Sequence, residues 1–148
     1  MVDVTFLPVT AAGVERALAM MAQLYSGNMR YDSVHARSAI EWLIENDSCG
    51  AAWFIEAAGQ QAGYLVLTVG YSLEFHGRYG LLDELFVEEA YRGQGIGTHA
   101  LAFAEQVCRL RALKALRLEV GRANPRAQTL YTRVGFHPHD RDLMTKWL

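Results

Sequence analysis

Three glycines at alternate positions, Gly93, Gly95 and Gly97, separate a strand-like run from a helical stripe. Residues 80–87 before them are mostly apolar, which is typical of a buried strand. The apolar residues after Gly95 recur at helical spacing; they are Ile96, Ala100, Phe103, Val107 and Leu110. A strand, a glycine turn and an amphipathic helix in this order predict a strand-to-helix unit inside a mixed α/β domain.

The first half of the chain predicts two helices and an antiparallel meander. We expect Thr10 to cap a helix that runs to about residue 25, and Ser33 to cap a second helix that ends near residue 46. The step Gly59-Gln60 has the character of a hairpin turn between runs rich in β-branched and aromatic residues. The strand-like runs are residues 4–8, 51–57, 62–69 and 80–87.

The second half predicts a further strand, a short helix and a strand-like tail. The long connection before residues 115–120 allows this strand to lie parallel to the one that precedes the glycine turn. Asn124 and Pro125 mark the start of a short helix, which Gly135 ends. Residues 136–148 have room for two more strands.

The composition is that of one folded domain over residues 1–148. Of these residues, 51% are apolar and only 3 are proline, which excludes disorder. No apolar run approaches the roughly 20 residues of a membrane-spanning helix, and no secretory leader is recognisable, so we expect a cytoplasmic location.

Cys49 and Cys108 lack the spacing of a metal site, and His137 with His139 provides too few ligands, so we expect no metal. The fold class is mixed α/β, with a mostly antiparallel sheet of six or seven strands and about four helices.

Charge is divided unevenly between the two parts of the chain. Residues 1–90 hold 4 basic and 12 acidic side chains, a balance of −8, whereas residues 91–148 hold 10 basic and 4 acidic ones, a balance of +6. Such a division suits a basic part that meets a polyanion and an acidic part that meets a cation. Simple attraction between the two parts explains the division equally well.

The glycine turn has the chemistry of an anion site. Glycines at positions 93, 95 and 97 allow positive φ angles, so that backbone N–H groups converge on a phosphate where the helix dipole favours negative charge. The spacing differs from the dinucleotide fingerprint, and no Gly-Lys-Ser/Thr follows. A tight strand-to-helix connection is the other interpretation of the same glycines.

Two segments around this turn resemble the signature regions of the GNAT superfamily of acyl-CoA N-acyltransferases. The first runs from Leu82-Asp-Glu-Leu-Phe-Val87 to Arg92-Gly-Gln-Gly-Ile-Gly97. The second is Asn124-Pro-Arg-Ala-Gln-Thr-Leu-Tyr-Thr-Arg-Val-Gly-Phe136. Motif-level similarity extends over residues 81–136, whereas residues 1–79 match only in the order of elements.

This resemblance implies that acetyl-CoA is the co-substrate. Its pyrophosphate would lie on the turn of Arg92, Gly95 and Gly97, and its acyl-pantetheine arm between splayed parallel strands, residues 83–87 and 116–120. The residues implied to bind it are Leu85, Phe86, Val87, Arg92, Gly93, Gln94, Gly95, Ile96, Gly97, Thr98, Asn124 and Tyr131.

Acetyl transfer to an amine needs an uncharged amine, a stabilised oxyanion and a proton for the thiolate. The resemblance implies Tyr131 as the acid, although a half-buried helix tyrosine with no catalytic role fits the sequence too. Asp83 and Glu84 are the candidates for the base. Adjacent strand residues point to opposite faces, so one of the two should reach the cleft unless a bulge changes the alternation; we favour Asp83. A water chain that takes the proton in place of either carboxylate stays open.

Tyr31 and Glu74, together with Asp83 and Glu84, are the candidates for acceptor binding.

The favoured function is acetyl-CoA-dependent N-acetyl transfer to a primary amine of a small molecule, polyamine or peptide, and the alternative is a non-catalytic acyl-CoA-binding or sensing module. We expect no nucleic-acid partner, because the basic residues are scattered and the whole chain is acidic, and no membrane partner. Sheet edges in a small domain also favour a homodimer.

Overall fold

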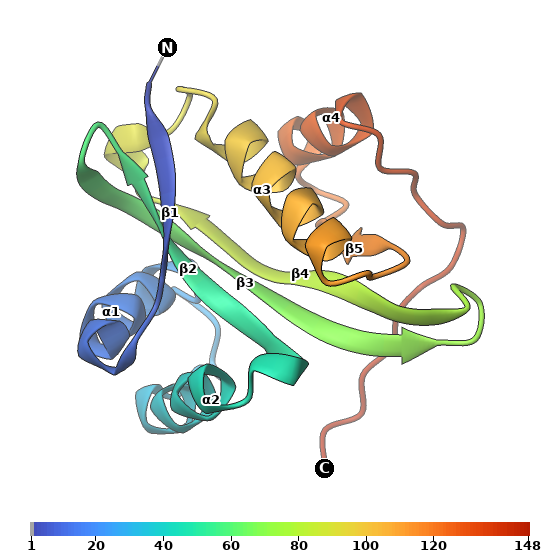
Figure 1. The fold of residues 1–148 in the computed structure, drawn as a ribbon, viewed down its shortest axis with the longest axis horizontal. Helices are drawn as coiled ribbons and strands as arrows, with labels where there is room; N and C mark the ends of the chain where they lie inside the picture. Colours follow the sequence, from blue (N-terminus) through green and yellow to red (C-terminus); the bar gives the residue numbers. More distant parts are fainter. Residues whose placement is uncertain (1) are drawn as a thin grey trace.

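Residues 2–148, described by a computed structural model, form one twisted sheet with helices on both faces (Figure 1). Neighbouring strands are antiparallel from β1 to β4, and β5 lies parallel to β4. The mixed α/β architecture is therefore confirmed, with the parallel pair at one edge. The strands, in their order across the sheet, are β1 (Val4–Pro8), β2 (Gly50–Ala57), β3 (Gln60–Ser72), β4 (Gly77–Val87) and β5 (Leu116–Leu118).

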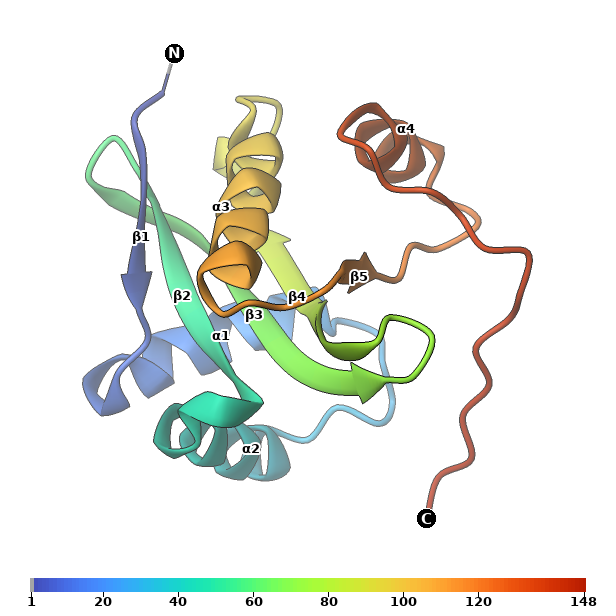
Figure 2. The same cartoon turned by 45° about the vertical axis from the view of Figure 1, so that its right-hand side comes forward.

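The prediction of six or seven strands is wrong, because the sheet in residues 2–148 has five. The two strands expected within residues 136–148 do not form; this segment is extended and passes the β3–β4 turn outside the sheet (Figure 2). Its apolar residues have strand propensity, but an extended run becomes a strand only where its backbone pairs with a neighbour. Within the described chain this segment pairs with none.

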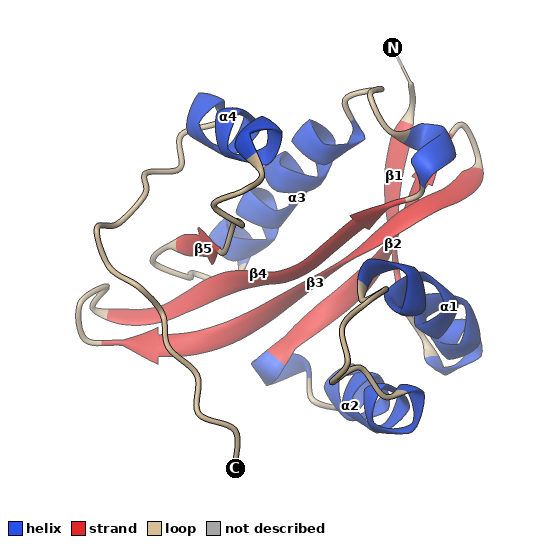
Figure 3. Ribbon diagram, turned by 180° about the vertical axis from the view of Figure 1, so that it is seen from behind, coloured by secondary structure: helices blue, strands red, loops and turns tan. Residues whose placement is uncertain are grey.

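Four α-helices cover the sheet, α1 and α2 on one face and α3 and α4 on the other (Figure 3). Among residues 2–148 no helix is long and apolar enough to span a bilayer. The helices are α1 (Val14–Leu24), α2 (Ser33–Glu45), α3 (Ile96–Leu110) and α4 (Pro125–Arg133).

The structure corrects both predicted N-caps in the first half. Thr10 precedes a short 3-10 turn, Ala11–Gly13, and α1 itself begins at Val14. Asp32 caps α2 in place of Ser33: its Oδ1 accepts a hydrogen bond from the backbone N–H of Val34 at 2.8 Å. Ser33 is instead the first helical residue, because the aspartate one position earlier already satisfies the free amides of the first turn.

Both faces of the central strands are buried, which explains their nearly continuous apolar sequence. Along β3, Leu65 and Leu67 pack beneath α3, whereas Tyr64 and Val66 pack beneath α1 and α2. Each of these four side chains is at most 6% exposed. The sheet is thus a rigid layer between two apolar cores, and its exposed β4–β5 edge is where polar side chains can gather.

Candidate active site

An extra residue in β4 changes the alternation of its side chains. Val66 of β3 pairs with Glu84, and the next residue, Leu67, pairs with Leu82, so Asp83 is a bulge without a partner. After this bulge, Glu84 faces the α1 side of the sheet, while Leu82 and Leu85 both face the α3 side. The bulge that was considered as an exception to the alternation is therefore present, and both carboxylates line the same pocket.

The parallel pairing of β4 with β5 ends at this bulge. The last pair is Leu82 with Leu118, and the edge of β4 from Asp83 to Val87 that faces away from β3 has no strand partner in the described chain. A pocket of about 430 Å³ occupies the place where the strands separate. Its lining residues are Leu24, Tyr25, Leu82, Asp83, Glu84, Leu85, Leu118, Glu119 and Tyr131.

Glu84 is held on both oxygens by tyrosines from distant parts of the chain. Tyr64 donates its hydroxyl proton to Oε1 at 2.6 Å, and Tyr25 donates to Oε2 at 2.9 Å. Burial raises the pKa of the Glu84 carboxyl, and the two hydrogen bonds act in the opposite direction. Because both oxygens already accept hydrogen bonds, Glu84 is a fixed acceptor rather than a freely available base.

Asp83 has no such partners in the described part of the chain. Its side chain is exposed to the pocket, and desolvation there raises its pKa, with the negative charge of Glu119 adding to the effect. A carboxylate with a raised pKa is a better proton acceptor than an ordinary aspartate. Of the two adjacent acids, Asp83 is therefore the one whose oxygens are available to a substrate.

Tyr131 lies across the same pocket on α4. Burial raises the pKa of its hydroxyl, which keeps it protonated at neutral pH. The ring packs edge-on against Phe136 at 6.0 Å between centroids. Asn124 fixes the start of α4, because its side-chain oxygen accepts a hydrogen bond from the N–H of Ala127 at 3.1 Å.

The glycine turn between β4 and α3 leaves backbone amides free. Gly93 and Gly95 have φ angles of 77° and 80°, and Gly95 caps α3 with no side chain bonded to the first turn. The first N–H groups of a helix have no intrahelical partner, so they can bind an anion. A Cβ atom on Gly95 would meet nothing within 4 Å, which shows that space is open there. The turn therefore fits a phosphate.

Helix α4 connects this turn to the pocket. A Cβ atom on Gly97 would lie 3.5 Å from Leu130, and one on Gly93 would lie 4.0 Å from the guanidinium of Arg126. Tyr131 follows Leu130 in the same helix and lines the pocket. Helix α4 therefore lies next to both the turn and the pocket.

The other residues implied to bind the cofactor are placed unequally. Leu85 lines the pocket, but Phe86 and Ile96 are buried in the cores, so only their backbone groups can face a ligand. Arg92 donates through Nε to the carbonyl oxygen of Val87 at 2.8 Å, which ties the turn to the end of β4. The exposed side chains on the turn are those of Arg92, Gln94 and Thr98.

The two remaining acceptor candidates do not line the pocket. Tyr31 stacks on Tyr25 at 5.5 Å, behind the pocket wall, and its buried hydroxyl has no hydrogen-bond partner in the described chain. Glu74 lies in the β3–β4 turn and pairs with Arg141 at 3.2 Å. Tyr64 and Glu119 were not predicted from the sequence. The strand predicted at residues 115–120 could have indicated Glu119, whereas no local pattern marks Tyr64.

A two-faced sheet, a parallel pair of strands that separates at its end and a glycine turn without a side-chain cap together form the framework of this site. The chain belongs to the Acetyltransferase (GNAT) family, whose model matches residues 18–136. The resemblance seen in the two signature segments is thereby confirmed.

Curated relatives are named as acetyltransferases. An N-acetyltransferase of Methanocaldococcus jannaschii is 27% identical over 97% of this chain and 64% of its own length. Thialysine N-epsilon-acetyltransferase of Mus musculus is 36% identical over 59% of this chain and 54% of its own length. The matched region thus spans less than two thirds of these relatives.

Solved structures share the fold over nearly the whole chain. An integron cassette protein from the Cole Harbour Salt Marsh metagenome has a TM-score of 0.84 at 28% identity, covering 97% of this chain and 90% of its own. An aminoglycoside N-acetyltransferase solved with coenzyme A has a TM-score of 0.79 and covers 99% of this chain and 96% of its own. Its identity is 15%, so this second likeness concerns the fold alone.

Proposed function

We propose that this protein transfers an acetyl group from acetyl-CoA to the primary amine of a cationic acceptor. The observation that carries the proposal is the meeting of Asp83, Glu84 and Tyr131 in one pocket, next to an open glycine turn. The family match supports the use of an acyl-CoA. The pocket supplies the acid and base groups that transfer to an amine requires.

The charges of the pocket support an acceptor whose reactive amine is far from any carboxylate. Three acidic residues, Asp83, Glu84 and Glu119, line it, and no lysine or arginine among residues 2–148 does. Such a site attracts ammonium groups and repels the carboxylate of an α-amino acid. The mouse relative is named for the ε-nitrogen of thialysine, which fits the same preference. Polyamines and lysine-like side chains are therefore the favoured acceptors.

Coenzyme A fits along α4, which lies next to both the turn and the pocket. The free amides at Gly95 and Gly97 would hold its diphosphate, and Arg126 lies beside the turn as a further positive charge. The unpaired edge of β4 would accept the pantetheine arm as an additional strand. Acetyl-CoA supplies the activated acetyl group, which the acceptor nitrogen attacks directly.

The protein's own groups then handle the protons. Glu84, fixed by its two tyrosines, holds the incoming ammonium, and Asp83 accepts one of its protons to release the nucleophilic amine. Backbone N–H groups on the free edge of β4 stabilise the negative charge that develops on the carbonyl oxygen. Tyr131 gives its proton to the departing sulfur and regains one when the product nitrogen loses its own.

Thiol release from acetyl-CoA, measured over a panel of amines, tests this proposal. We expect release with diamines and ε-amines, and little with amino acids whose only amine is the α-amino group. The substitution Asp83→Asn should lower kcat by roughly 10²-fold or more, while Asp3→Asn, an exposed site at the start of the chain, should leave it unchanged. If acetyl-CoA binds but no amine in the panel leads to thiol release, the result would contradict the proposal and favour a non-catalytic binding module.

A further inference from the structure

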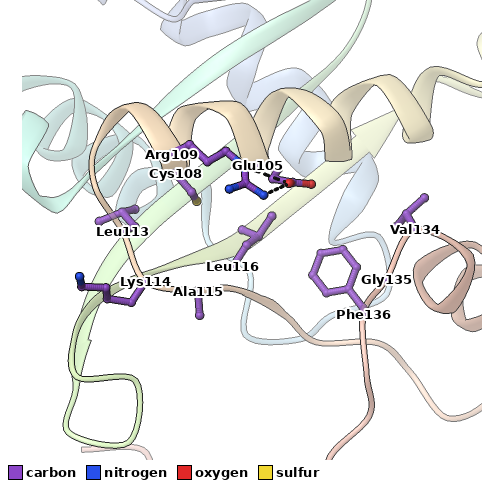
Figure 4. A pocket seen from close by; sticks show the side chains of 10 residues that line it. All are labelled: Glu105, Cys108, Arg109, Leu113, Lys114, Ala115, Leu116, Val134, Gly135 and Phe136. Carbon is purple, nitrogen blue, oxygen red and sulfur yellow. Dashed lines mark hydrogen bonds and ion pairs between the residues drawn. The ribbon is translucent and has the colours of Figure 1, made fainter.

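An arginine lies on the sheet just beyond the pocket of about 430 Å³ between β4 and β5, which we call the acceptor pocket. Arg117 is the middle residue of β5 and pairs with Leu81 of β4. The acceptor pocket begins one residue further along each strand, at Leu118 and Leu82. Figure 4 shows the neighbour Leu116 on the α3 side, where it lines a separate pocket of about 340 Å³. Because successive strand residues point to opposite faces, Arg117 lies on the face of the sheet away from α3.

Aromatic rings hold the guanidinium of Arg117 in place. Its Cζ lies 5.1 Å from the ring centroid of Phe75 and 5.5 Å from that of Tyr79. The two rings pack edge-on, with 5.6 Å between their centroids. The ring of Tyr79 also covers Gly70, its partner in β3, because a Cβ atom on Gly70 would lie 2.6 Å from it. A cation is attracted to the faces of such rings, so they fix the position of the charge without neutralising it.

The N–H groups of this half-buried guanidinium are unused. Among residues 2–148, no ion pair or hydrogen bond engages the side chain of Arg117. Glu74 of the β3–β4 turn pairs instead with Arg141 at 3.2 Å. The hydrogen bond from Arg141 is the main cause of the lowered pKa of Glu74, and the charge of Arg117 contributes least. A fixed guanidinium with free in-plane donors suits a carboxylate, whose two oxygens match its fork of N–H groups.

Opposite charges therefore lie at two levels of the same strands. Glu119 follows Arg117 by two residues, so it faces the same side of the sheet. Desolvation and, after it, the charge of Glu119 raise the pKa of Asp83, so these two carboxylates lie near each other in the acceptor pocket. Tyr79, which marks the level of the guanidinium, precedes Asp83 by four residues in β4. At the usual rise of a strand, with the bulge shortening the last step, this separation is about 12 Å.

An extended amino acid with an amine at the end of its side chain spans this separation. With three or four methylene groups in the side chain, five or six bonds of about 1.5 Å join the terminal nitrogen to the carboxylate carbon, which is roughly 6–7 Å in zigzag. A hydrogen bond of about 3 Å at each end extends the distance between the two protein groups to roughly 12–13 Å. A shorter side chain does not reach both groups.

We propose that Arg117 binds the carboxylate of the acceptor while Asp83 and Glu84 receive its side-chain amine, so that the preferred acceptors are basic amino acids with three or four side-chain methylene groups. The inference rests on the proposed acetyl transfer and narrows its acceptor from any cationic amine to an ω-amino acid. A polyamine binds less well, since its second ammonium group would lie against the positive guanidinium. The α-amine of the acceptor stays beside the anchored carboxylate, away from the thioester.

Matched acceptors test the role of the carboxylate in the native protein. Cadaverine is lysine without its carboxylate, and lysinamide is lysine with that charge removed. Measured by thiol release from acetyl-CoA, kcat/KM should be higher for lysine than for either compound by roughly tenfold or more, through a lower KM. The amino acid 2,3-diaminopropionate, with one methylene group, should be a poor acceptor. Equal KM values for lysine and lysinamide would overturn the proposal.

The substitution Arg117→Gln tests the role of the guanidinium. It should raise KM for lysine by roughly tenfold or more and leave kcat and KM for cadaverine unchanged, which also shows that the variant is folded. Arg109→Gln, at an exposed position on α3, is the matched control and should change neither acceptor. A purely structural role of Arg117 would affect lysine and cadaverine alike, and that result would refute the assignment.

The position of the acetyl group provides a further readout. Mass spectrometry of acetylated lysine should find the acetyl group on the ε-nitrogen, and acetylation of the α-nitrogen would contradict an anchored carboxylate. The two proposals also fail differently. If the native protein acetylates cadaverine as well as lysine, acetyl transfer stands and only the assignment of Arg117 is lost. If no amine leads to thiol release, both are lost.

Discussion

The hydroxyl of Tyr64 donates a 2.6 Å hydrogen bond to one carboxylate oxygen of Glu84 across the β3–β4 pairing. Tyr64 is fully buried, so this contact is shielded from water and fixes the carboxylate in one orientation. Burial and, after it, the negative charge of Glu84 raise the pKa of the tyrosine, which therefore remains a donor at every pH at which the protein would function. This pair sets the position of one wall of the pocket.

Replacement of Tyr64 by phenylalanine should destabilise the protein in a pH-dependent manner. The change leaves a carboxylate oxygen without its donor, which costs about 1–3 kcal/mol in the free energy of unfolding. Because the lost hydrogen bond favours the charged form, the folded pKa of Glu84 rises further. The loss should thus be larger at pH 8, where Glu84 is ionised, than at pH 5. Urea unfolding at both pH values measures this loss in the free energy of unfolding. We expect Tyr25→Phe to cause a smaller loss. Equal losses for Tyr64→Phe at the two pH values would contradict the prediction.

The substitution Glu119→Gln should extend activity to lower pH. The charge of Glu119 contributes to the raised pKa of Asp83, so its removal lowers that pKa toward the ordinary value. If Asp83 accepts the proton of the acceptor's ammonium group, the fall of kcat on the acid side of the pH profile should move to lower pH. The profile of kcat is the appropriate measurement, because Glu119 also attracts the acceptor and its loss raises KM. Glu45→Gln on α2 serves as the control, and an unmoved limb in Glu119→Gln would exclude Asp83 as the acceptor of the proton.

Loss of the Tyr131 hydroxyl should slow turnover without weakening coenzyme binding. Tyr131→Phe keeps the ring against Phe136 but removes the proton for the leaving thiolate. We expect kcat to fall by roughly 10²-fold, with the acetyl-CoA affinity from calorimetry within a factor of about two. Tyr71→Phe, at an exposed position on β3, is the matched control. Unchanged kcat across the pH range would remove Tyr131 as the acid.

A side chain on the glycine turn should block coenzyme binding. Gly95 has a φ of 80°, and Gly27 in the α1–α2 connection has a φ of 83° with equally open surroundings. Valine at either position therefore strains the backbone by about 1–2 kcal/mol. Only Gly95→Val should weaken acetyl-CoA binding, by tenfold or more, because its Cβ atom enters the space of the diphosphate. Equal affinities of the two variants in calorimetry would contradict the assignment of the turn.

The features that were predicted correctly from the sequence depend on local interactions. The glycine turn, the stripe that begins at Ile96 and the Asn124–Pro125 helix start were all predicted and are all confirmed. Each depends on the backbone freedom or side-chain hydrogen bonding of a few consecutive residues, which the sequence states directly. The cap of α2 was misplaced by one residue, because Asp32 and Ser33 are both good caps and only geometry selects between them.

The polar site itself was decided by tertiary structure. Tyr25 and Tyr64 lie 59 and 20 residues from Glu84, and no local pattern connects them. The bulge at Asp83 arises from the register between β3 and β4, which depends on packing of both sheet faces. In the same way, strand propensity in residues 136–148 could not become a strand without a partner edge. The sequence by itself determined the helices, the first five strands and the glycine turn. The pairing of distant segments decided which carboxylate is held, which is free and which edge of the sheet stays open.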